Sequence, residues 1–218
     1  MNKWKESELV RSLLGFFLLF LLFVGLFIFI VPSTHQSSKI AEKIKSIKNE
    51  NVTYVAIGDS LTQGVGDSSN QGGFVPVLSQ ALESDFDWQV TSRNYGIAGN
   101  TSNQILKRMQ EKKDIQRDLK KAKVMTLTVG GNDVIHVIKD NITNLNVATF
   151  TKPAQAYQKR LGQIIELARK ENKTLPIYIV GIYNPFYLNF PEMTEMQTIV
   201  DNWNQSTEEV CKEYDNVY

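Results

Sequence analysis

The sequence predicts an α/β domain built on a parallel β-sheet, and two observations support this fold class. From residue 52 onward, apolar runs typical of strands alternate with segments of helical periodicity. The runs VMTLTV and PIYIVGIY are apolar throughout, as expected for strands of a parallel sheet that is covered on both faces. Such alternation is typical of a doubly wound α/β domain, which binds its ligands beyond the carboxyl ends of the strands.

The predicted elements follow one another along residues 51–218, which we take as the folded domain. Strands are expected at residues 52–57, 88–94, 124–129 and 175–182, and helices at 72–84, 101–121, 153–172 and 192–214. Pro153 and Asn172 are typical of the two ends of a helix. The last four residues, DNVY, are typical of a turn that enters a fifth strand. Because the sequence ends there, we expect that strand to be truncated and the domain to be incomplete at its C-terminus.

An uncharged apolar segment precedes the domain. Residues 12–31 form 20 consecutive residues without a charge, which is the length of a transmembrane helix. The PSTHQ sequence that follows is a poor match to a signal-peptidase site, so we expect an uncleaved anchor after a short leader, residues 1–11. Lysines lie on both sides of the span, so the positive-inside rule does not decide its orientation. The short leader resembles a signal-anchor, which predicts a cytoplasmic N-terminus and an extracytoplasmic domain.

Residues 32–50 form a lysine-rich linker between the anchor and the domain. Ile40, Ile44 and Ile47 recur at helical spacing, which is consistent with a short amphipathic stalk helix. A solvated linker and a contact of the lysines with the membrane surface are the two alternatives.

Composition excludes several classes of function. The net charge is +1, from 24 basic and 23 acidic residues, so there is no basic excess to indicate a nucleic-acid partner. Cys211 is the single cysteine, which rules out an internal disulfide, and we expect it to be a small apolar residue on a helix face. His35 and His136 are about a hundred positions apart and show no spacing typical of zinc ligands.

Three segments rich in glycine and small polar residues follow the first three predicted strands. They are GDSLTQG at residues 58–64, NYGIAGNT at 94–101 and GGND at 130–133. The first segment has no Walker phosphate-loop pattern, no dinucleotide-binding fingerprint and no G-x-S-x-G elbow. A serine at a strand-to-helix turn, here Ser60, exposes its hydroxyl to a substrate.

The same segments carry candidate donors for an oxyanion. The Ser60 backbone N–H, the Gly99 N–H and the Asn132 side-chain amide follow adjacent strands and are expected to converge. Gly99 lacks a Cβ, so its backbone can approach a substrate closely. Asp59 and Asp133 are expected to hold their turns through hydrogen bonds from side chain to backbone.

In order and spacing, the three segments resemble the first three blocks of the SGNH, or GDSL, hydrolase family of esterases and lipases. The resemblance covers the chain from about residue 52 to its end. It implies that Ser60 is the nucleophile and that Gly99 and Asn132 complete the oxyanion hole. It also implies a flavodoxin-like three-layer α/β/α sandwich with a parallel sheet, and no metal or organic cofactor.

We expect no counterpart anywhere in this sequence to the family's last block, an Asp-x-x-His near the C-terminus. We therefore expect the catalytic His and Asp to be absent from this chain. Either the sequence ends before that block, or the chain is a non-catalytic relative or has an unusual active site. His136 is a poor candidate for a substitute base, and His35, in the linker, is a poorer one. We expect the 218 residues as given to be inactive or nearly so.

Two functions stay open. The first is a membrane-anchored serine ester hydrolase that acts on lipid esters or on acetyl esters of a surface glycan. The second is a membrane-tethered, non-catalytic protein that binds an ester or a glycan. The aromatic segment at residues 183–190, with Tyr183 and Phe186, forms either an apolar wall for an acyl chain or a cap packed on the sheet edge.

Overall fold

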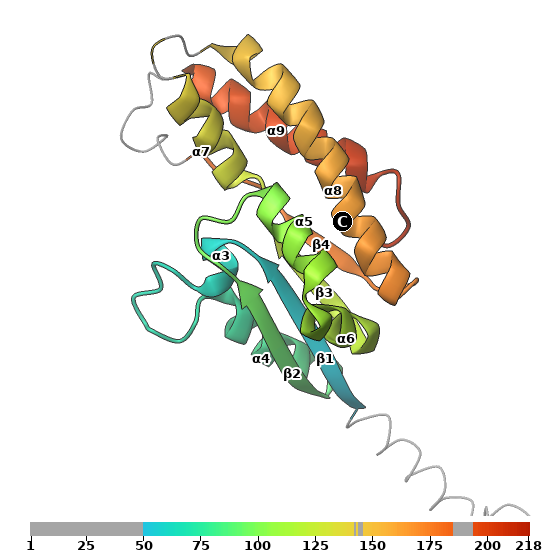
Figure 1. Cartoon of the computed structure of the whole chain (residues 1–218). Helices are drawn as coiled ribbons and strands as arrows, with labels where there is room; N and C mark the ends of the chain where they lie inside the picture. Colours follow the sequence, from blue (N-terminus) through green and yellow to red (C-terminus); the bar gives the residue numbers. More distant parts are fainter. Residues whose placement is uncertain (1–49, 142, 144–145, 185–193) are drawn as a thin grey trace, which may run out of the picture. The chain divides into compact units, whose positions relative to one another are not determined.

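Four parallel strands form the sheet, in the spatial order β2–β1–β3–β4 (Figure 1). The strands are β1 (Glu50–Gly58), β2 (Trp88–Gly96), β3 (Ala122–Thr128) and β4 (Ile177–Val180). β1 pairs in parallel with β2 and β3, and β3 pairs in parallel with β4. Each of the four strands lies where the sequence predicts one, so the predicted α/β class with a parallel sheet is confirmed.

The structure, a computed structural model, describes residues 50–141, 143, 146–184 and 194–218. Residues 49–218 form one compact unit. The predicted leader and anchor lie outside the described residues, as do Phe186 and the predicted linker except its last residue, Glu50, which begins β1. Among the residues that the structure describes, no helix is both long and apolar enough to cross a membrane.

Helices flank the sheet on both faces. They are α3 (Ser60–Gln63), α4 (Phe74–Phe86), α5 (Ser102–Glu111), α6 (Lys113–Lys121), α7 (Gly131–Asp140), the 3₁₀ turn η1 (Val147–Phe150), α8 (Thr151–Glu171) and α9 (Thr194–Cys211). Successive side chains of a strand point to opposite faces. Tyr54 and Ala56 of β1 accordingly pack in a small cluster with α4. Val55 and Ile57 pack in the larger core with α5, α6, α8 and α9.

One predicted helix is two helices. The segment expected to be continuous over 101–121 breaks at Lys112, whose backbone is extended (φ −93°, ψ 107°). Gln116 of α6 donates from its side-chain amide to the carbonyls of Met109 and Gln110, at 3.0 and 2.9 Å. Because these carbonyls lie in the last turn of α5, the amide satisfies groups that a helix end leaves without partners.

The last predicted strand is shorter than expected. β4 ends at Val180, and the backbone of Ile182 is bound by the side-chain amide of Asn204 from α9, at 2.9 and 2.8 Å. On the edge of β4 that does not pair with β3, Val217 forms a single parallel bridge with Ile177. That bridge lies where the sequence predicts a fifth strand to begin.

A buried carboxylate attaches the edge strand β2 to α6. Asp118 accepts a hydrogen bond from the Tyr95 hydroxyl at 2.7 Å and pairs with Arg117 at 3.0 Å and Arg93 at 3.5 Å. Burial raises the pKa of the Asp118 carboxyl, but the hydrogen bonds from Tyr95 and Arg117 and the charges of Arg117 and Arg93 lower it by more. Its pKa in the folded protein is therefore below its ordinary value.

We predict that Asp118→Asn lowers the free energy of unfolding at pH 7 by about 1–3 kcal/mol. A depressed folded-state pKa stabilises the protein above the unfolded-state pKa of about 4, and this contribution is lost as pH falls through the folded-state value. The difference between variant and wild type is thus expected to shrink below about pH 4. Urea unfolding at pH 7 and pH 3 measures it, with the exposed Asp114→Asn on the same helix as control. A difference that does not change with pH contradicts the prediction.

Candidate active site

Ser60 lies at the point where β1 turns into α3. Asp59 caps this helix, since its Oδ1 accepts the Leu61 N–H at 3.1 Å, and Gly64 ends it in a left-handed conformation (φ 90°). Gly58 leaves no room for a side chain, because a Cβ there would lie 2.1 Å from the Thr128 hydroxyl oxygen. Ser60 is half-buried, and within the described part of the chain its hydroxyl has no hydrogen-bond partner.

Two buried threonines hold this turn against β3. The Thr128 hydroxyl donates to Asp59 Oδ1 at 2.7 Å and accepts the Asp59 N–H at 3.1 Å. The Thr62 hydroxyl lies 2.8 Å from that of Thr128 and 3.3 Å from the Ile57 carbonyl oxygen, and both are acceptors for its single proton. Asp59 thus holds the serine turn, as the sequence predicts. The sequence analysis missed Thr62 and Thr128, although a hydroxyl at the end of an apolar strand was a signal for the second.

The segment after β2 is held close to α3. The Asn94 amide donates to the Thr62 carbonyl at 2.7 Å, and the Gln63 side chain accepts the Ala98 N–H at 2.6 Å. A Cβ on Gly96 would lie 2.1 Å from the Gln63 nitrogen, so only glycine permits this approach of the two backbones. The neighbouring Gly99 is exposed, with φ +78°, and no atom lies within 4 Å of the position that a Cβ would take. No described group accepts its N–H.

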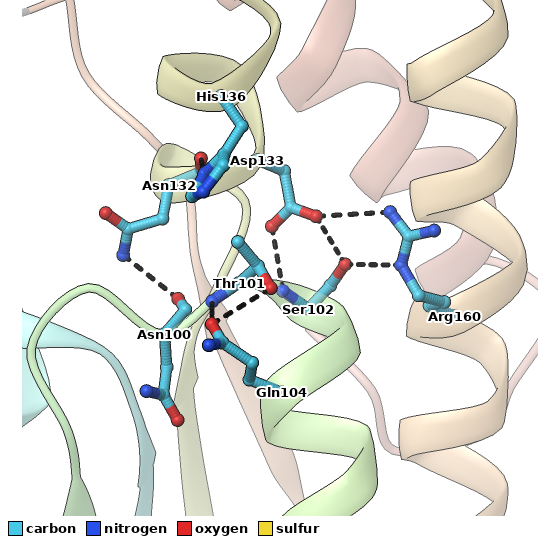
Figure 2. Close-up of polar contacts among 8 residues, drawn as sticks. All are labelled: Asn100, Thr101, Ser102, Gln104, Asn132, Asp133, His136 and Arg160. Carbon is cyan, nitrogen blue, oxygen red and sulfur yellow. Dashed lines mark hydrogen bonds and ion pairs between the residues drawn. The ribbon is translucent and has the colours of Figure 1, made fainter.

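Asn132 is aimed across the gap between the second and third segments (Figure 2). Its Nδ2 donates to the Asn100 carbonyl at 2.9 Å. A side-chain amide carries two N–H groups, and among the described residues the second one has no acceptor. The carbonyl of Asn100 therefore orients the amide and leaves one donor for a ligand.

Ser60, Asn132 and Tyr183 line one cavity of about 170 Å³. The rest of its lining is mainly apolar and includes Leu61, Val129, Val134, Ile135, Ile138, Val180, Ile182, Met196 and Val200. Gly99 is not part of this lining. The structure thus brings three of the predicted site residues to one cavity, which extends between α7, the end of β4 and α9.

Asp133 and His136 stand in an Asp-x-x-His spacing, so the expectation that this sequence has none anywhere is wrong. The spacing begins at the last residue of the third segment and runs into α7. Asp133 is buried and bound to Ser102 and Arg160. His136 is exposed, and its Nδ1 lies 2.7 Å from the Asn132 carbonyl oxygen. The two side chains therefore have separate partners. His136 is not among the residues that line the cavity.

Metal ligands and the thiol of Cys211 are the other reactive groups to consider. Within the described ranges, no three His, Cys, Asp or Glu residues lie together as a metal site would require. Cys211 is partly buried and packs against the main core, as predicted, and burial together with the nearby Glu208 raises the pKa of its thiol. Its thiol thus stays protonated at neutral pH, and Cys211 is not among the residues that line the cavity beside Ser60.

Comparison with known proteins finds one matching family model and similar proteins from two Bacillus species. The model of the GDSL-like Lipase/Acylhydrolase family matches residues 56–218. The protein YpmR of Bacillus subtilis is 33% identical over 182 residues, which cover 83% of this chain and 71% of YpmR. The spore germination lipase LipC of Bacillus licheniformis is 30% identical over 138 residues, 61% of this chain and 64% of LipC.

A solved structure has the same fold. The lipase Lip_vut3 from a goat rumen metagenome superposes with a TM-score of 0.67 at 23% identity, over 77% of this chain and 79% of its own. At that identity the likeness concerns the fold alone.

We predict that Thr128→Val and Thr126→Val each lower the free energy of unfolding by about 1–3 kcal/mol, because each removes a buried hydroxyl from its partners. Thr126 is the matched control: it lies two residues earlier on β3, and its hydroxyl is 2.7 Å from that of Tyr54, in the small cluster under α4. Only Thr128→Val is expected to slow the reaction of Ser60 with a fluorophosphonate. Intact-mass labelling rates at a temperature where all variants are folded measure this. Equal rates for the two variants contradict the assigned role of Thr128.

Proposed function

Because the chain belongs to the GDSL-like lipase/acylhydrolase family, we propose that it hydrolyses carboxylic esters through an acyl-enzyme in which Ser60 is the nucleophile. The observation that carries the proposal is the place of Ser60, at the lining of an apolar cavity that Asn132 also lines. Ser60 Oγ bonds to the ester carbonyl carbon and gives its proton to a base, and the alcohol leaves with a proton. Water then attacks the acyl group, releases the acid and restores Ser60.

The oxyanion of the tetrahedral intermediate takes its hydrogen bonds from the Ser60 N–H, the Gly99 N–H and the Asn132 amide. The lack of acceptors for two of these donors supports the assignment. Within the described residues, the Gly99 N–H and one Asn132 N–H have no acceptor. Donors that are already oriented need no reorganisation when charge develops on the substrate, which is why such sites lower the barrier.

Esters of apolar acyl chains are the proposed substrates, in preference to acetyl esters. The cavity beside Ser60 is lined by branched aliphatic side chains and Met196, and an acetyl group would leave most of it unfilled. Each methylene that enters such a lining contributes about 0.8 kcal/mol, which is on the order of fourfold in kcat/KM. Tyr183 lies at the mouth, where it is 66% exposed, in keeping with a wall for the chain.

A second candidate is a non-catalytic protein that binds esters or glycans. One observation favours it: no described residue contacts the Ser60 hydroxyl, so no described group is placed to accept its proton. A protein of this kind keeps the cavity and the donors but turns substrate over very slowly.

The proposed location is the extracytoplasmic face of a membrane. Residues 12–31 support it by their length and lack of charge, and a short basic leader precedes them. An anchor of this kind would hold the cleft near lipid esters and near esters of surface glycans alike.

We predict slow hydrolysis of p-nitrophenyl esters by the 218-residue chain, and a loss of at least about tenfold in Ser60→Ala. Ser92→Ala, which removes an exposed hydroxyl from β2, is expected to match the wild type. Hydrolysis that survives Ser60→Ala rules out the nucleophile. Saturable ester binding with no turnover that depends on Ser60 supports the non-catalytic alternative.

We also predict that kcat/KM rises from acetyl to hexanoyl p-nitrophenyl esters, and that Val180→Asp flattens this rise. Val180 lines the cavity and is 42% exposed, so an aspartate there is compatible with folding and places a charge beside the acyl chain. Val77→Asp, on α4 and 60% exposed, is the matched control, because Val77 is not part of the cavity lining. A preference for acetyl esters in the wild type contradicts the substrate assignment without affecting that of Ser60.

A further inference from the structure

An ion pair between Asp133 of α7 and Arg160 of α8 also binds Ser102 at the start of α5 (Figure 2). The Asp133 carboxylate, whose side chain is 7% exposed, is 3.1 Å from Nη2 of Arg160, which reaches it from α8. The same carboxylate accepts the Ser102 N–H at 2.8 Å and the Ser102 hydroxyl at 2.6 Å. Arg160 also donates from Nε to the Ser102 hydroxyl oxygen at 2.7 Å.

The proton of Ser102 has a defined direction in this network. A guanidinium N–H only donates, so the hydroxyl oxygen must accept from Arg160 and direct its own proton to Asp133. Arg160 thus closes a ring of three side chains, and its planar fork supplies two donors at separate nitrogens, which a lysine does not. Every member of the ring has a partner, so the buried charge of Asp133 is compensated.

The ring lies between two backbone segments that carry proposed oxyanion donors. Asn132 immediately precedes Asp133, and Gly99 lies three residues before Ser102. A second link, from the Asn132 amide to the Asn100 carbonyl, joins the same two segments at 2.9 Å. Displacement of Asp133 from Ser102 would therefore change the distance between the Gly99 N–H and the Asn132 amide.

We propose that Arg160 is a positioning residue of the oxyanion site: by binding Asp133 and Ser102 together, it sets the separation of the Gly99 and Asn132 donors. The assignment of those donors rests on the proposed function. Arg160 is not among the residues that line the cavity, and it comes from a helix outside the three glycine-rich segments. Its effect on the reaction passes entirely through the two backbone segments that it joins.

The first test observes the donors directly. In the 218-residue chain in detergent, Arg160→Met is expected to shift or broaden the NMR signals of the Gly99 N–H and the Asn132 side-chain amide. Arg169→Met is the matched control, because Arg169 lies on the same helix and binds the carbonyls of Leu175, Asp215 and Asn216 at the far end of the sheet. Unchanged donor signals in Arg160→Met, or equal changes in both variants, overturn the proposal.

The second test separates positioning from general loss of structure. For Ser60-dependent release of p-nitrophenolate, Arg160→Met is expected to lower kcat by tenfold or more, on the order of what a misplaced donor costs, with KM within about twofold of the wild type. Arg160→Lys keeps the charge and is expected to restore part of the rate. If Arg160→Met lowers the melting temperature no more than Arg169→Met but leaves kcat unchanged, the proposal is overturned.

The esterase function and the positioning role of Arg160 are refuted by different results. Absence of any Ser60-dependent release from the wild type contradicts the esterase function, and the NMR comparison then still decides whether Arg160 positions the two amide donors. Should Arg160→Met fail to fold, Arg160→Lys and Ser102→Ala provide the same comparison with smaller changes. Donor signals that stay unchanged in both of these variants overturn the proposal as well.

Discussion

The architecture of the site depends on one hydroxyl, that of Thr128 at the carboxyl end of β3. It accepts a hydrogen bond from the Asp59 N–H, donates one to the Asp59 carboxylate and contacts the Thr62 hydroxyl. All three residues are buried. These bonds hold the turn that presents Ser60 against the neighbouring strand. Gly58 permits the approach because it has no Cβ. A buried hydroxyl without these partners would be destabilising, so the turn and the strand are energetically coupled.

The two carboxylates near the cleft have structural roles, because both bind backbone and side-chain groups of neighbouring segments. Asp59 caps α3 and binds Thr128, and Asp133 neutralises Arg160 and binds Ser102. Each of these carboxylates is held in place by the groups that bind it. The polar groups therefore fix the backbone around the cleft. Among the described residues, the Ser60 hydroxyl, the Gly99 N–H and one N–H of the Asn132 amide are left without acceptors.

The cavity itself combines this rigid polar edge with an apolar interior. Ser60 and Asn132 lie at one side of it, and side chains from α7, β4 and α9 form the rest. Such a division suits a substrate with a polar reacting group and an apolar chain, because each part meets a matching environment. The membrane segment expected at residues 12–31 is consistent with the same class of substrate.

The sequence by itself determined the strands, most of the helices, and the three loops that carry Ser60, Gly99 and Asn132. It could do so because apolar runs, helical periodicity and glycine act over short stretches of chain. Only the tertiary structure decided that Thr128 holds Asp59, 69 residues away, and that Arg160 binds Ser102, 58 residues away. It also decided the break at Lys112 and the early end of β4, where side chains of Gln116 and Asn204 bind backbone groups. Partners of that kind are chosen by packing between distant segments, and no local pattern of residues records which segments will meet.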